Sequence, residues 1–99
     1  MQISFQNKTA ASALKAVSSG LSNWDFGKNI SLDLGENLMT ITIKKMGTSK
    51  ISFNVVRVGK MVHFLKKEEK IAISHRPIRS VIESKLISIV KENNGSVSH

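Results

Sequence analysis

The sequence predicts an α+β fold in which an antiparallel β-meander of four or five strands, with a short N-terminal strand, carries two helices on one face. Through residues 30 to 74, apolar side chains alternate with polar ones, which is typical of strands with one buried face. On either side of this region, apolar side chains recur at helical spacing. The expected element order is β-α-β-β-β-β(β)-α, and residues 1–99 fit a single domain.

The N-terminal region predicts one strand and one helix. Ile3 and Phe5 alternate with polar residues, so residues 2 to 6 are expected to form a strand at an edge of the sheet. Thr9 can cap the helix that follows, because its hydroxyl can accept a hydrogen bond from a first-turn amide. Gly20 is expected to end that helix in a left-handed conformation.

The middle of the chain predicts a run of hairpins. Residues 30 to 34 and 38 to 45 are the clearest pair of strands, and the turn-forming sequence Gly35-Glu36-Asn37 separates them. Residues 46 to 49 form the next turn, and a third strand follows from residue 50 to residue 56.

Beyond Val56 the apolar phase changes around Gly59, which indicates either a tight turn or a bulge within one long strand. Residues 66 to 69, with the sequence Lys-Lys-Glu-Glu, are predicted to form a hairpin loop. Residues 70 to 74 would then return as a strand with Ile71 and Ile73 facing inward.

Pro77 marks the start of the last helix, because a first-turn residue needs no N–H. One apolar stripe follows it: Ile78, Val81, Ile82, Leu86, Ile89 and Val90. Asn93-Asn94-Gly95 ends the helix, and residues 95–99 are expected to form a disordered tail.

The positive charge is concentrated in the C-terminal part of the chain. Residues 1 to 43 hold three Lys and three acidic residues, whereas residues 44 to 99 hold twelve Lys or Arg and four Glu. The whole net charge of +8 therefore belongs to the second segment. A field of this sign attracts anionic partners such as nucleic acid or an acidic protein.

Composition also excludes several classes of site. The chain has no Cys, so it has no disulfide and no thiolate zinc site. We expect no metal, no cofactor and no membrane span, and we expect a cytoplasmic location. His63 and His75 lack a paired carboxylate at a recognisable spacing, so the chain is not expected to be an enzyme, although a small basic nuclease stays open.

Two Arg at the start of the last helix are the sharpest candidates for an anion site. The N-terminus of a helix is partly positive and is usually occupied by acidic residues. We therefore expect an anionic group close to Arg76 and Arg79. That group could be a ligand phosphate, or it could be Glu68 or Glu69 of the preceding segment; simple solvation is a third alternative. The predicted anion-binding residues are Lys44, Lys45, Lys66, Lys67, Lys70, Arg76 and Arg79.

These residues predict a binding module that engages nucleic acid through its phosphates, with little base specificity. The outward positions of the central strands, Thr40, Thr42, Ser52 and Asn54, offer no aromatic platform for bases. The alternative is an adaptor, inhibitor or immunity-type protein that docks on an acidic protein surface. Ile87 and Lys91 would then contact the partner, and a homodimer is also possible.

From Arg57 onward, a Gly after a strand, His63-Phe64, the strand Ile71-Ala72-Ile73 and the pattern of residues 85 to 91 loosely resemble the C-terminal part of HicA-type RNA-cleaving toxins. The resemblance covers less than half of the chain. The family's G-S-H motif would fall on Gly59-Lys60-Met61, which has no His, so the resemblance implies no activity here.

Overall fold

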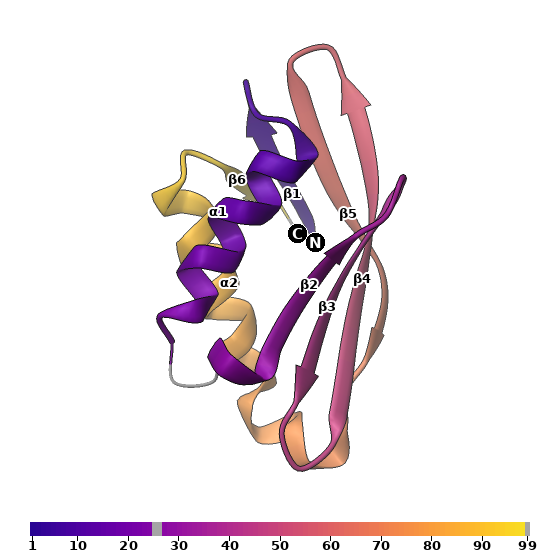
Figure 1. Cartoon of the computed structure of the whole chain (residues 1–99), viewed down its shortest axis with the longest axis vertical. Coiled ribbons are helices and arrows are strands. Elements are labelled where there is room, and N and C mark those ends of the chain that lie inside the picture. Colours follow the sequence, from indigo (N-terminus) through magenta and orange to yellow (C-terminus); the bar gives the residue numbers. More distant parts are fainter. Residues whose placement is uncertain (25–26, 99) are drawn as a thin grey trace.

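Within residues 1–24 and 27–98, which the computed structural model describes, the chain forms the predicted α+β fold: an antiparallel sheet of six strands with both helices on one face (Figure 1). The elements are β1 (Gln2–Gln6), α1 (Ala10–Ser22), the 3-10 turn η1 (Gly27–Asn29), β2 (Ile30–Leu34), β3 (Leu38–Lys44), β4 (Thr48–Val58), β5 (Met61–Lys70), the 3-10 helix η2 (Ile73–Ile78), α2 (Arg79–Glu92) and β6 (Ser96–Ser98).

The strand order is β2-β3-β4-β5-β1-β6, so β2 to β5 form the predicted meander. β1 was expected at an edge, but it lies between β5 and β6. The expectation of a disordered tail is also wrong for residues 96–98, and His99 lies outside the described residues. Both errors have one cause: α2 brings the chain back alongside β1, where Val97 pairs with Ile3 and packs against the core.

The core lies between the sheet and the two helices. The side chains that the alternation assigns to the inner face of β3 and β4 are all buried: Met39, Ile41, Ile43, Ile51, Phe53 and Val55. Phe5 and Phe64 meet edge to face, with their ring centroids 6.3 Å apart. In the described part of the chain, the opposite face of the sheet carries no helix (Figure 1).

Helix α1 begins as predicted but ends later. The Oγ1 of Thr9 accepts a hydrogen bond from the amide of Ser12 at 3.1 Å, which caps the helix. Gly20 does not end the helix, which continues to Ser22. Instead, Gly20 allows close packing on α2, because a Cβ at this position would lie 2.8 Å from Cγ2 of Ile89.

The long hairpin of β4 and β5 resolves one open alternative: Gly59 and Lys60 form a tight turn. The predicted loop at residues 66 to 69 is wrong, because β5 runs through it to Lys70. The predicted strand at residues 70 to 74 is therefore also wrong. Its Ile73 belongs to η2 and is 79% exposed.

A bulge explains why a charged run stays within β5. The register shifts between Ser52 and Phe53, which leaves Lys67 as the extra residue on β5. This shift puts both Lys66 and Glu69 on the inner face, where they form an ion pair. Because the opposite charges of Lys66 and Glu69 compensate each other, both side chains can lie on the inner face of β5.

The last helix also begins later than predicted. Pro77 lies inside η2, and α2 starts at Arg79. Val81 was expected on the buried stripe but is 49% exposed. None of the helices in the described part of the chain has the length and apolar character needed to cross a bilayer.

Candidate functional site

The β3–β4 turn and η2 are joined by hydrogen bonds around His75, a side chain that is only 3% exposed. Its Nε2 lies 2.6 Å from the carbonyl oxygen of Lys45, and its Nδ1 lies 2.5 Å from Oγ of Ser49. Because a carbonyl oxygen can only accept, Nε2 carries the proton. In the neutral ring, Nδ1 then accepts from the Ser49 hydroxyl.

Two further hydrogen bonds complete this contact. The buried Oγ of Ser49 accepts from the amide of Ala72 at 2.9 Å, and Oγ of Ser74 donates to the carbonyl oxygen of Met46 at 2.7 Å. We call these residues the His75 network: Lys45, Met46, Ser49, Ala72, Ser74 and His75. The network fixes η2 against the β3–β4 turn, so residues far apart in the sequence share one end of the molecule (Figure 1).

Cations gather at this end. Lys50 and Lys70 are direct partners on β4 and β5, and Lys44 lies at the end of β3. Like charges in direct cross-strand register repel each other, so this arrangement costs stability unless an anion is nearby. Lys45 and Arg76 belong to the two segments that the His75 network joins. We call these five residues the basic end: Lys44, Lys45, Lys50, Lys70 and Arg76.

Few acidic groups balance the basic end. Residues 44 to 50 and 70 to 80 contain no Asp or Glu. Nζ of Lys70 lies 3.5 Å from Oε1 of Glu68, but both side chains are more than half exposed, so the pair is weak. Among the residues that the structure describes, Lys44, Lys50 and Arg76 take part in no ion pair.

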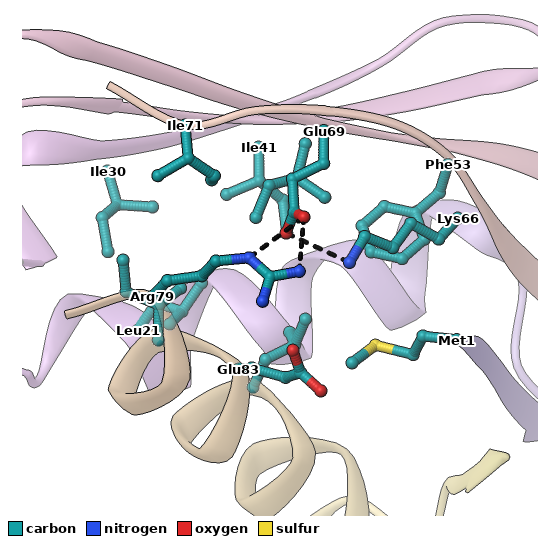
Figure 2. Close-up of a pocket in the computed structure, with 13 residues that line it drawn as sticks. Met1, Leu21, Ile30, Ile41, Phe53, Lys66, Glu69, Ile71, Arg79 and Glu83 are labelled. Carbon is teal, nitrogen blue, oxygen red and sulfur yellow. Dashed lines mark hydrogen bonds and ion pairs between the residues drawn. The ribbon is translucent and has the colours of Figure 1, made fainter. Parts of the chain in front are cut away.

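Besides Lys70, two further predicted anion-binding residues have an internal partner, and both contact Glu69. Arg79 donates from Nε and Nη2 to Oε2 of Glu69, at 3.1 and 2.6 Å, and Nζ of Lys66 lies 3.1 Å from Oε1 of the same carboxylate (Figure 2). The alternative in which Arg79 pairs with a Glu of the preceding segment is therefore the one observed. The three residues of this ion-pair triad help to line a pocket whose other walls are mainly apolar side chains of the sheet and the two helices.

The carboxylate of Glu69 stays ionised near neutral pH. Burial of Glu69 favours its protonated form, but the hydrogen bonds from Arg79 and Lys66 outweigh this effect and lower the pKa of Glu69 below its usual 4.5. The hydrogen bonds that Arg79 donates to Glu69 likewise raise the pKa of Arg79. Because its charges satisfy one another, the triad is better suited to joining α2 to β5 than to binding a ligand.

The remaining predicted contact residues do not join the basic end by any contact that the structure shows. Lys67 is exposed at the bulge in β5. Ile87 is partly buried and Lys91 is exposed, both on α2. Their predicted roles stay predictions.

The two histidines have separate partners. On the uncovered face of the sheet, Nδ1 of His63 lies 2.7 Å from Oγ of Ser4 and 3.3 Å from Nε2 of Gln2, whereas His75 lies within its own network. In the part of the chain that the structure describes, no group of three or more His, Asp or Glu could hold a metal ion. Each histidine therefore has a Ser hydroxyl as a hydrogen-bond partner.

Comparisons with protein-family models, with curated proteins and with solved structures found no match to this chain.

Proposed function

We propose that the basic end binds nucleic acid, mainly through its phosphates, and has no catalytic role. One observation carries the proposal: Lys50 and Lys70 face each other across β4 and β5, Lys44 and Arg76 lie at the same end, and residues 44 to 50 and 70 to 80 contain no Asp or Glu. Phosphates would relieve this repulsion, and neutralising them releases condensed counterions.

The uncovered face of the sheet supports backbone contacts over base reading. Thr40, Ser52 and Asn54 occupy its central positions, and Phe53 is 1% exposed on the opposite face. Sheets that read single-stranded bases need aromatic side chains on the open face. The expected binding is therefore weakly selective for sequence.

The test compares two triple variants that lose the same charge. Lys44→Ala, Lys50→Ala and Arg76→Ala together remove cations of the basic end. Lys8→Ala, Lys15→Ala and Lys60→Ala remove three cations outside it, including Lys60 in the β4–β5 turn at the opposite end of the long axis (Figure 1). Affinity for random-sequence oligonucleotides is measured by fluorescence anisotropy at one low salt concentration.

We expect the first variant to bind at least about 100-fold more weakly than the unmodified chain, because charge-assisted contacts contribute about 1 kcal/mol or more each. The second variant should bind nearly as well as the unmodified chain. Equal losses in both variants would show that only net charge matters, and no binding by the unmodified chain would remove the proposal.

A second candidate function is docking on an acidic protein. It is favoured by apolar side chains on the uncovered sheet face, where Val56 is 42% and Val58 is 59% exposed. Charge would then set the rate of association and the choice of partner. The discriminating measurement is a pull-down from nuclease-treated lysate: a partner retained by the unmodified chain but lost by Val56→Ser/Val58→Ser supports this candidate.

A further inference from the structure

Two strongly exposed apolar side chains lie at the basic end. Met46 is 89% exposed and Ile73 is 79% exposed, more than any other large apolar side chain in the described part of the chain. Met46 belongs to the β3–β4 turn and Ile73 to the start of η2. Neither side chain belongs to the hydrophobic core. Binding of phosphates alone would not use these apolar side chains either.

The fold holds these residues on adjoining segments. The carbonyl oxygen of Met46 accepts the hydrogen bond from Ser74, the residue next to Ile73. The two segments approach so closely that a Cβ at Gly47 would lie 2.8 Å from Oγ of Ser74. Because the His75 network fixes both backbones, the apolar pair is presented in a defined place, with Lys44 and Lys45 immediately before Met46.

We infer that Met46 and Ile73 form an apolar wedge that inserts at a base step of duplex DNA while the cations of the basic end bind the flanking phosphates. This inference rests on the proposed function and names its substrate class: duplexes with an easily unstacked pyrimidine–purine step. Met and Ile are among the side chains that proteins insert from the minor groove, where they unstack a step and bend the duplex.

The same combination of apolar and basic residues could contact an anionic bilayer, but the local structure favours DNA. Helices that lie on membranes present a continuous apolar face. Here the two apolar residues are separated by polar or small neighbours such as Gly47 and Ser74, so they match a single base step better than an extended lipid surface.

The experiment uses a short duplex with the fluorescent base 2-aminopurine beside a central TA step. The variant Met46→Ser/Ile73→Ser removes the apolar pair without changing charge. Leu38→Ser/Val81→Ser is the matched control, because it removes two exposed apolar side chains elsewhere. All four positions are exposed, so the fold should persist, and thermal unfolding checks this.

Binding of the unmodified chain should raise the 2-aminopurine fluorescence, since the base becomes unstacked. Met46→Ser/Ile73→Ser should lose that rise and bind at least about tenfold more weakly, because the apolar contacts of both side chains with the bases are lost. Its salt dependence should be unchanged, and the control should behave like the unmodified chain.

The inference fails if Met46→Ser/Ile73→Ser binds with unchanged affinity and fluorescence; the proposed function then survives. If the unmodified chain does not bind the duplex at low salt, the inference fails, and the proposed function fails with it only if random-sequence oligonucleotides are not bound either. A third arm uses phosphatidylcholine vesicles containing phosphatidylserine. If Met46→Ser/Ile73→Ser weakens binding to the vesicles but not to DNA, Met46 and Ile73 contact membranes, and the inference that they insert into DNA is wrong.

Discussion

At the scale of single residues, Ser49 is the centre of the contact that forms the basic end. Its hydroxyl donates to Nδ1 of His75 and accepts from the amide of Ala72. Ser49→Ala leaves both of these groups without a partner in a buried place. We expect the free energy of unfolding to fall by about 1 to 3 kcal/mol, measured by urea denaturation.

Ser52→Ala is the matched control for Ser49→Ala, because Ser52 lies on the same strand but faces the uncovered side of the sheet. It should change the stability by less than about 0.5 kcal/mol. Equal stability of the two variants would show that the His75 network contributes nothing to the folded state.

The ion-pair triad of Glu69, Arg79 and Lys66 predicts that the stability of the fold depends on pH. The pKa of Glu69 is lower in the folded state than its usual 4.5, so the unfolded chain binds the proton more readily. The triad therefore stabilises the fold above this pH, and its contribution disappears as the pH falls through the folded-state pKa.

Glu69→Gln tests this dependence, because it removes the titrating group while keeping the size of the side chain. The stability difference between the unmodified chain and Glu69→Gln should be largest near neutral pH and should shrink as the pH falls below 4.5. Parallel stability curves over this range would contradict the role given to the triad.

Some single-residue roles could be predicted from the sequence and others could not. The capping role of Thr9 follows from its place before a helical pattern, and the structure confirms it. The inward direction of Lys66 and Glu69 could not be predicted, because it depends on a bulge that changes the phase of β5. Lys50 was missed as a site residue, since only the strand register reveals Lys70 beside it.

At the scale of elements, the contact between α1 and α2 depends on Gly20. A Cβ there would lie within 3.0 Å of three side-chain atoms of Ile89, which is itself 1% exposed. Gly20→Ala gains about 1 kcal/mol of helix propensity, but overpacking a core costs about 1 to 3 kcal/mol. Because Ile89 has little room to move, we expect a net loss of stability of about 1 kcal/mol.

Ser19→Ala serves as the control for Gly20→Ala, because Ser19 is an exposed neighbour in the same helix. Thermal unfolding should show a lower Tm for Gly20→Ala and an unchanged or slightly higher Tm for Ser19→Ala. A higher Tm for Gly20→Ala would mean that the helices separate easily to admit the methyl group.

The existence of most elements could be predicted, but their ends could not. Period-two alternation identifies β2 and β3 because each has one buried face. β6 has a single apolar residue, Val97, and pairs with a strand at the other end of the chain, so no local pattern reveals it. The start of α2 was misplaced because Pro77 suits η2 as well as a first helical turn.

At the scale of the whole molecule, the fold divides the positive charge of the C-terminal segment into groups with different roles. The molecule measures 40 × 23 × 23 Å. Lys66 and Arg79 are held by Glu69, whereas the basic end lies at one extreme of the long axis (Figure 1). Composition predicted the sign of the field, but only tertiary contacts determine which cations converge.

This division predicts a limited salt dependence for DNA binding. Each neutralised phosphate contributes about 0.9 to the slope of log affinity against log salt on duplex DNA. The basic end has five cations, so we expect a slope between about −3 and −4.5. A net charge of +8 acting as a whole would instead give a slope near −7.

Anisotropy titrations of a short duplex over a series of salt concentrations measure this slope directly. A value near −7 would mean that DNA contacts cations along the entire molecule, and a value near zero would mean that phosphates do not drive binding.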